Sequence, residues 1–131
     1  MMRIKEFPFL SVEVDEKASV ISLHWSSEFT SEQYRQGCTW GLERVTALQL
    51  RYWLADTSKF ARLQPADQKW TSEFLFPELS KVGLVKMAVV IPEDLYSHLA
   101  ISTIIVEAKD ATTFDTHYFV KQEEALAWMQ S

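Results

Sequence analysis

Polar and apolar residues alternate near the amino terminus of the chain, and this pattern predicts two short strands. Residues 7–14 are extended in character, and residues 18–25, which read Ala-Ser-Val-Ile-Ser-Leu-His-Trp, alternate over much of their length. A period of two is typical of a strand with one buried face. Residues 15–17 are all charged and form a turn between the two strands, so we expect an antiparallel hairpin.

A helix should begin shortly after this hairpin. Thr30 is followed three residues later by Gln33, which is the capping-box pattern found at many helix starts. The apolar positions that follow recur every three or four residues. They form one helical stripe made of Tyr34, Cys38, Leu42, Val45 and Leu48.

Gly37 and Gly41 lie one turn apart on a neighbouring line of the same helix. Glycine lowers helix propensity, so two glycines in one helix need a physical reason. Either the helix backbone packs very closely on the sheet, or the glycines border a groove for a ligand. Close packing is the more common use of glycine, and both interpretations stay open at this point.

Apolar strands follow in the remainder of the chain. Residues 51–56, Arg-Tyr-Trp-Leu-Ala-Asp, form a central strand, and residues 86–91 form another. These runs are too uniformly apolar for a sheet face in contact with water, so both strands should be buried on both faces. Residues 116–120 form the last strand.

Proline residues mark the helices between these strands. Pro65 suits the first turn of a helix with Trp70 and Phe74 on its inner face. Pro77 should end or kink that helix, and residues 78–82 could continue it before Gly83 closes it.

Two more helices complete the pattern. Residues 92–94 open a helical region that runs to about Lys109 and could be broken near His98. Residues 123–129 form a short terminal helix whose inward side chains are Ala125, Trp128 and Met129.

The fold class predicted by this order is α/β. We expect one domain spanning residues 1–131, with a five-stranded, mostly parallel sheet, an N-terminal β-hairpin, one antiparallel edge strand and about four helices. Leu54, Val89 and Val90 should lie at the centre of the sheet. The strand-to-helix loops of such a sheet open at one edge, where ligands and partners usually bind.

Composition excludes several classes of function. The chain has 131 residues, a net charge of -5 and no Lys/Arg cluster, which argues against a nucleic-acid or anionic-membrane surface. The single cysteine cannot form an internal disulfide. Since the chain shows neither a secretory signal nor a stretch apolar enough to span a bilayer, we expect a cytoplasmic protein.

The candidate site follows the central strand directly. Asp56, Thr57, Ser58 and Lys59 stand where that strand should reach the loop edge. One interpretation is structural, with Asp56 and a hydroxyl capping and turning the chain. The others are a phospho-acceptor hydroxyl and a direct ligand contact. A regulatory Ser58 should be exposed and not bonded to Asp56, whereas a structural Ser58 should be buried and bonded to nearby backbone.

Motifs for catalysis and cofactors give little support to an enzyme. His24, His98 and His117 are far apart and lack metal-ligand spacing, and no glycine-rich phosphate loop or G-x-S-x-G motif occurs. Cys38 falls on the inward stripe of its helix and should be inert. We therefore expect no cofactor and no metal. The alternative is a small hydrolase or transferase acting through Asp56 and Ser58.

Several stretches together carry a resemblance to a known family. They are residues 53–59, 65–70, 86–94, 118–119 and 124–128, with Pro77. These stretches are similar to small bacterial SpoIIAA-like proteins, the STAS or SEC14-like domain family, and the likeness covers nearly the whole chain from about Glu13. Its motifs are mostly structural.

The resemblance implies two kinds of function. Some STAS proteins are anti-sigma-factor antagonists in which a partner kinase phosphorylates a serine after the central strand, and Ser58 or Thr57 occupies a similar place here. Residues 59–62 and Pro65 stand where that family has a run of small residues leading into the helix. The SEC14-like side of the resemblance implies a small apolar or lipid-like ligand and no catalytic residues.

Taken together, the residues and the resemblance favour a non-catalytic regulatory or binding domain. It should bind a protein partner or a small apolar ligand at the strand-end edge, or in a groove beside Gly37 and Gly41. An exposed edge strand over residues 7–14 would also allow strand-mediated homodimerisation.

Overall fold

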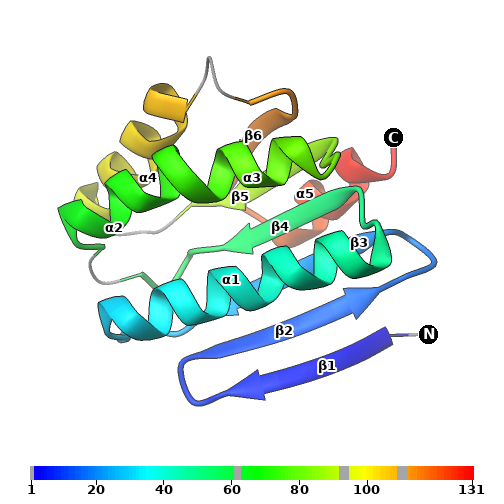
Figure 1. Cartoon of the computed structure of the whole chain (residues 1–131), viewed down its shortest axis with the longest axis horizontal. Coiled ribbons are helices and arrows are strands. Elements are labelled where there is room, and N and C mark those ends of the chain that lie inside the picture. The colour runs from blue at the N-terminus through cyan, green and yellow to red at the C-terminus, as the bar shows by residue number, and fades with distance from the viewer. Residues whose placement is uncertain (1, 61–62, 92–94, 109–111) are drawn as a thin grey trace.

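Six strands form a single sheet in the computed structural model, which describes residues 2–60, 63–91, 95–108 and 112–131. Along the sheet the strands follow their order in the chain (Figure 1). They are β1 (Met2–Phe7), β2 (Leu10–Asp15), β3 (Val20–Trp25), β4 (Tyr52–Asp56), β5 (Lys86–Val90) and β6 (Asp115–Phe119).

The first two neighbouring pairs are antiparallel and the other three are parallel, so β2 alone runs against the rest. The α/β class and the hairpin before the first helix are confirmed, but the prediction of five strands is wrong. Phe7 pairs with Leu10, so Pro8 and Phe9 form a tight turn inside the segment predicted to be one strand. Proline suits this turn because it has no N–H to donate to a ladder. The extra strand, β1, is therefore the sheet edge, and β2 is paired on both sides.

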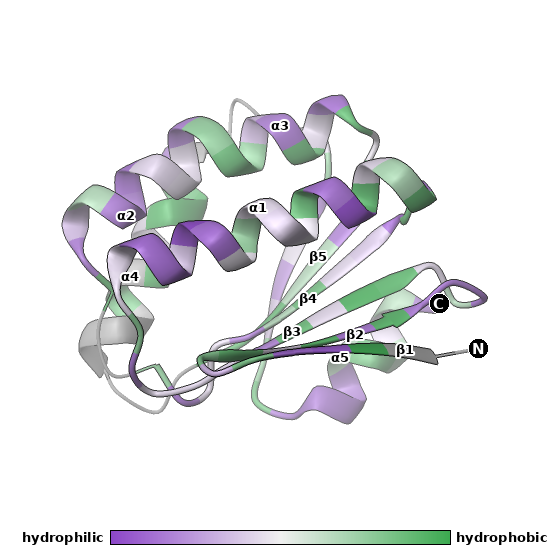
Figure 2. Ribbon diagram, turned by 60° about the horizontal axis from the view of Figure 1, so that its bottom comes forward, coloured by the Kyte–Doolittle hydropathy of each residue, from purple (hydrophilic) through white to green (hydrophobic). Residues whose placement is uncertain are grey.

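Helices cover the two faces of the sheet unequally. Right-handed crossovers between strands laid down in sequential order place every connecting helix on the same side. Figure 2 shows these helices together on one side of the sheet, which we call the covered face, and α5 on the other, which we call the outer face. The helices are α1 (Ser31–Leu48), α2 (Pro65–Trp70), the π-helical turn η1 (Thr71–Leu75), α3 (Phe76–Lys81), α4 (Leu95–Ala108) and α5 (Gln122–Met129).

The capping box at the start of α1 is confirmed. The Thr30 hydroxyl accepts a hydrogen bond from the Gln33 amide at 3.1 Å, and the Gln33 side chain accepts one from the Thr30 amide at 2.9 Å. Two orphan donors of the first helical turn are satisfied in this way.

Pro77 neither ends nor separates its helix. Residues 65–81 run on as α2, η1 and α3, and the π-helical turn lies immediately before the proline. The Phe76 amide donates to the Thr71 carbonyl, five residues back. Proline lacks an N–H and crowds the carbonyl four residues before it, and a wider π turn accommodates both.

Two predictions about α4 have different outcomes. The helix is continuous from Leu95 to Ala108, so no break occurs near His98. The proposed opening at residues 92–94, and Lys109 at the end, lie outside the described residues.

Side chains on the two faces form two separate cores. The larger core, on the covered face, includes Trp25, Trp53 and Met87, and the smaller one, on the outer face, joins Leu54 and Val90 to α5. Leu54 and Val89 are buried in neighbouring strands near the middle of the sheet, as predicted. In α5, Ala125 and Met129 are buried as expected, whereas Trp128 is only half-buried.

Candidate functional site

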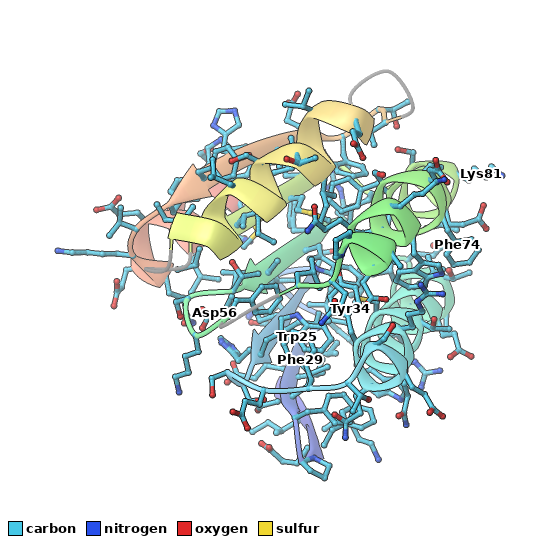
Figure 3. All side chains as sticks on the ribbon, turned by 90° about the vertical axis from the view of Figure 1, so that its left-hand side faces the viewer. Trp25, Phe29, Tyr34, Asp56, Phe74 and Lys81 are labelled. Carbon is cyan, nitrogen blue, oxygen red and sulfur yellow. The ribbon has the colours of Figure 1, made fainter. Side chains whose placement is uncertain are left out.

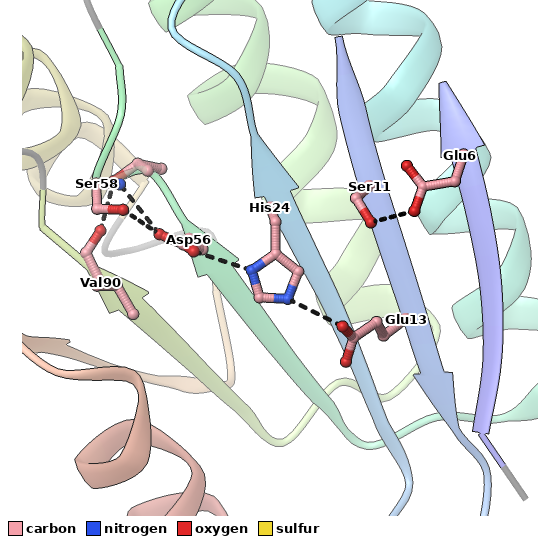
Figure 4. A network of polar contacts seen from close by, with 8 residues as sticks. Glu6, Ser11, Glu13, His24, Asp56, Ser58 and Val90 are labelled. Carbon is pink, nitrogen blue, oxygen red and sulfur yellow. Dashed lines mark hydrogen bonds and ion pairs between the residues drawn. The ribbon is translucent and has the colours of Figure 1, made fainter. Parts of the chain in front are cut away.

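A polar network lies on the outer face, where β3 and β4 reach the loop edge of the sheet (Figure 4). His24 is the second-last residue of β3, and Asp56, the last residue of β4, is its register partner in the parallel pair. Their side chains point to the same face because paired residues of neighbouring strands share a side. Ser58 follows in the turn after β4.

The Asp56 carboxylate is at the centre of this network. One oxygen, Oδ2, lies 2.9 Å from His24 Nδ1. The other, Oδ1, accepts hydrogen bonds from Ser58 Oγ at 2.6 Å and from the Ser58 amide at 3.2 Å. The carboxylate therefore separates the hydroxyl from the imidazole.

These contacts shift the ionisation of both members of the pair. The hydrogen bond to Asp56 raises the pKa of His24 above its ordinary value, against the lowering effect of burial. Burial by itself raises the pKa of Asp56, but hydrogen bonds from His24 and Ser58 outweigh it, and the net pKa is lowered. The pair therefore favours a charged carboxylate beside a protonated imidazole.

Glu13 extends the network to a third strand. Its Oε1 lies 3.9 Å from His24 Nε2, which is longer than a hydrogen bond. Within the described part of the chain, Nε2 is buried and has no hydrogen-bond partner. A proton on Nε2 would face the Glu13 carboxylate, so β2, β3 and β4 are linked through one titratable ring.

The other two predicted site residues take different positions. Thr57 is buried, and both its hydroxyl and its amide donate to the Val90 carbonyl, at 2.7 and 3.2 Å. It fastens the end of β4 to β5 and cannot be reached by a kinase. Lys59 is exposed, and Ser58 is half-buried.

Asp56 and Lys59 also border a shallow hollow on the surface. It has a volume of about 250 Å³, and His24, Glu6 and Ser11 contribute to its lining from the hairpin strands. Ser11 donates a hydrogen bond to Glu6 at 2.9 Å. Phe7 and Leu10 also line the hollow, which is of mixed polarity and open to solvent.

The arrangement does not match a nucleophile with its base. In a hydrolytic triad, the imidazole lies between the hydroxyl and the carboxylate and takes the hydroxyl proton. Here the carboxylate is in the middle, and its lowered pKa makes it a weak base for a serine hydroxyl.

The space beside Gly37 and Gly41 is filled by the protein itself. A methyl group added to Gly37 would meet the Trp25 ring at 2.8 Å, and one added to Gly41 would meet the Trp53 ring at 2.7 Å. These distances are shorter than any ordinary carbon contact, so α1 lies directly on two indole rings. Close packing accounts for both glycines, and the rings occupy the place of the expected groove.

An apolar cavity lies between the helices and the sheet on the covered face. Its volume is about 40 Å³, and its lining includes Trp25, Tyr34, Cys38 and Leu75. A pocket for a drug-sized ligand measures roughly 300 to 1,000 Å³. Cys38 is buried there, and burial raises the pKa of its thiol, which makes it unreactive.

The cavity continues into an aromatic cluster at the loop edge. Figure 3 shows Trp25, Phe29 and Tyr34 close together near the start of α1. Phe29 packs against Trp25 and Phe60, with ring centroids 5.3 and 5.2 Å apart. The Tyr34 hydroxyl and Thr71 Oγ1 share a buried hydrogen bond of 2.7 Å, which ties α1 to the π turn.

Sequence reasoning missed His24 and Glu13 as members of the site. A signal was available, because His24 and Asp56 both lie at the ends of strands expected to be neighbours. Only the register of the parallel pair places them opposite each other, and no local pattern specifies that register.

Comparison with known proteins gives a likeness to a solved structure. No family model matches the chain, and no curated protein matches it in sequence. The crystal structure of apo-SiaC from Pseudomonas aeruginosa resembles it with a TM-score of 0.53 and 16% identity, over 89% of this chain and 98% of that one. At this identity the likeness supports the α/β fold alone. In the described part of the chain, no helix is long and apolar enough to cross a membrane.

Proposed function

We propose that the protein is a non-catalytic regulatory or binding domain of the STAS/SpoIIAA-like type. It would engage a protein partner at the loop edge around Asp56, Ser58 and Lys59. The observation that carries this proposal is the position of the Asp56 carboxylate between Ser58 and His24.

The network is suited to holding a surface in one shape. β3, β4 and the turn after β4 meet at the Asp56 carboxylate, which accepts two hydrogen bonds from Ser58 and one from His24. Partly buried charge-assisted hydrogen bonds of this kind fix geometry strongly. Lys59 and the neighbouring hollow, whose lining is both polar and apolar, then present a defined surface to a partner.

A catalytic serine has less support. An activated hydroxyl needs a base that accepts its proton, and the imidazole bonds the other carboxylate oxygen. Incubation with a fluorophosphonate probe tests this directly. We expect no labelling above the level of a Ser58→Ala control, and stoichiometric labelling at Ser58 would establish the hydrolase instead.

A phospho-switch at Ser58 is also less favoured than simple binding. Its hydroxyl donates to the Asp56 carboxylate, a bond that a regulatory serine is not expected to make, and a phosphate would add about two negative charges beside that carboxylate. Ser58→Asp mimics that charge. We expect it to lower the free energy of unfolding by more than about 2 kcal/mol, since buried like charges are costly. A smaller loss would return the switch to consideration.

Cross-linking in cells tests the partner surface. Lys59 is exposed at the loop edge, where the parallel strands end, whereas Lys81 ends α3 shortly before β5 begins. An amine-reactive reagent should link a partner through Lys59 and not through Lys81. Ser58→Arg should abolish the Lys59 links, and unchanged links would contradict a partner site at this edge.

A very small apolar ligand is the second candidate, favoured by the apolar cavity beneath α1. Its volume of about 40 Å³ has room for only a few heavy atoms. A lipid chain would require the helices to move apart. Native mass spectrometry of protein purified without denaturation would reveal a retained ligand, and the bare mass would weaken this candidate.

A further inference from the structure

The two edges of the sheet differ in how they could receive another strand. Figure 1 shows β1 and β6 at opposite ends of the sheet, and no other strand of the described chain lies beyond either of them. Edge strands in monomers are commonly protected by charged residues, proline or bulges. β1 carries Arg3, Lys5 and Glu6, whereas β6 reads Asp-Thr-His-Tyr-Phe and is followed by Val120.

The side chains of β6 are directed by its contacts with α5. His117 and Phe119 pack against Trp128, with ring centroids 4.4 and 5.6 Å apart, so odd-numbered residues face the outer side. Thr116 and Tyr118 face the covered side. Tyr118 is 40% exposed and Val120 is 74% exposed. Large apolar side chains are thus presented along this edge.

The backbone of β6 is oriented to accept a partner. The Asp115 amide donates to the Val85 carbonyl, and the Phe119 carbonyl accepts from the Ile91 amide. The backbone N–H and C=O groups of these odd-numbered residues therefore point toward β5. In a parallel ladder, alternate residues direct theirs to opposite sides. The backbone groups of Thr116 therefore point to the outside of the sheet.

We propose that two copies of the protein pair through β6 in antiparallel orientation, with Tyr118 at the two-fold axis. A two-fold axis perpendicular to the sheet keeps both helical layers on one side and makes one continuous sheet. In this register Thr116 faces Val120 of the second copy, and His117 faces Phe119. Asp115 faces Lys121, which has an extended backbone with φ -117° and ψ 137°.

Charge selects this register over its neighbour. The pairing centred on Tyr118 sets opposite charges, Asp115 and Lys121, against each other at both ends of an uncharged centre. A pairing centred on His117 would set Asp115 against Phe119 and leave Lys121 opposite Thr113. Opposite-charge pairs across antiparallel strands stabilise, and like-charge pairs destabilise.

The same reasoning excludes self-pairing of β1. Two antiparallel registers of β1 with the β1 of a second copy are the longest that keep both helical layers on one side of the sheet. One register places Arg3 opposite Lys5, and the other places Lys5 opposite the second copy's own Lys5. Both are like-charge pairs. The homodimer expected from the sequence at residues 7–14 has no edge to use, since β2 is an inner strand. The β6 dimer is independent of the proposed partner site at Asp56.

Charge exchange tests the dimer in the intact protein. Sedimentation velocity should show a dimer for the wild type. Asp115→Lys and Lys121→Asp each create two like-charge pairs per dimer, so each should weaken association roughly tenfold. The double variant should restore it. Lys69→Glu, an exposed residue of α2 that belongs to neither edge strand, is the matched control and should leave association unchanged. Circular dichroism checks that each variant is folded.

Disulfide trapping tests the register. Directly opposed residues of a hydrogen-bonded antiparallel pair have Cα atoms about 5.5 Å apart, within disulfide range. Tyr118→Cys should therefore give a covalent dimer on oxidation. Thr116→Cys should not, because it faces Val120, and the native Cys38 is buried.

Three results would overturn the proposal. The first is a wild-type protein that stays monomeric at its highest soluble concentration. A monomer whose β6 pairs with an extended segment of another protein counts as the same result. The second is a dimer that neither single charge variant weakens. The third is trapping through His117→Cys in place of Tyr118→Cys.

Discussion

The covered and outer faces of the sheet are built from the same strands, but the first carries most of the buried apolar side chains and the second carries the polar network. On the covered face, three helical segments bury Trp25, Trp53 and Met87 in a continuous aromatic and aliphatic core. On the outer face, one eight-residue helix covers a small core, and His24, Asp56 and other polar groups lie beside it. Apolar burial is the dominant source of stability, so the covered face holds the fold and leaves the outer face free to carry polar chemistry.

The largest expected effect is on the covered face. Trp53 is 3% exposed and packs against Gly41. Trp53→Ala should lower the free energy of unfolding by about 3 to 5 kcal/mol, because it removes a buried indole and leaves a cavity. Urea denaturation measures this loss. A loss below about 1 kcal/mol, typical of surface sites, would mean that this face is not the stabilising one.

Gly41→Ala tests the close packing from the helix side. The added methyl group meets the Trp53 ring at 2.7 Å, so the ring or helix must move. Overpacking of this kind costs about 1 to 3 kcal/mol. The same substitution in the Trp53→Ala background should cost less, because the obstacle is gone. Equal costs in the two backgrounds would show that the glycine serves some other purpose.

Trp128→Ala gives the matching measurement on the outer face. Its ring stacks on His117 and Phe119 but is only half-buried. We expect a loss of about 1 to 2 kcal/mol, below the value for a fully buried tryptophan. Denaturation under the same conditions as for Trp53→Ala allows a direct comparison. A loss as large as that of Trp53→Ala would remove the distinction between the two faces.

The smallest effect is the pH dependence of the His24–Asp56 pair. The raised pKa of His24 gives stability that is complete below its ordinary value of 6.5 and is lost as the pH rises through the folded value. The lowered pKa of Asp56 gives stability that is present above 3.8 and is lost as the pH falls through the folded value. The pair should therefore stabilise most between these two values.

His24→Asn isolates this contribution. The difference in unfolding free energy between wild type and variant should be about 1 kcal/mol in the acidic window and should shrink above neutral pH. Nuclear magnetic resonance titration of His24 is the sharper measurement. Its pKa should fall in Asp56→Asn, and an unchanged pKa would show that the hydrogen bond is not the cause.

Several features of the fold were predictable because they depend on neighbouring residues. Thr30 and Gln33 cap α1 through local hydrogen bonds, and Pro65 lies in the first turn of α2, so each could be recognised from a few positions. Pro77 left two outcomes open, because a proline can end a helix or only distort it. The helix continues through residues 65–81, with a π turn immediately before the proline.

The candidate site was only half predictable. Asp56 and Ser58 are two residues apart, and their hydrogen bond is of a kind that short polar side chains commonly make. His24 is 32 positions away from Asp56. Its place beside the carboxylate follows from strand register, which no local pattern specifies.

The sequence by itself determined the alternation of strands and helices, since hydrophobic periodicity and caps act within a few residues. Tertiary structure alone decided that Gly37 and Gly41 accommodate indole rings, that Thr57 is buried and bonded to the Val90 carbonyl, and that β1 and β6 form the two edges. Each of these depends on contacts between segments far apart in the chain. Such contacts are selected by the packing of whole faces, and the free energy of that packing is not a property of any single stretch of sequence.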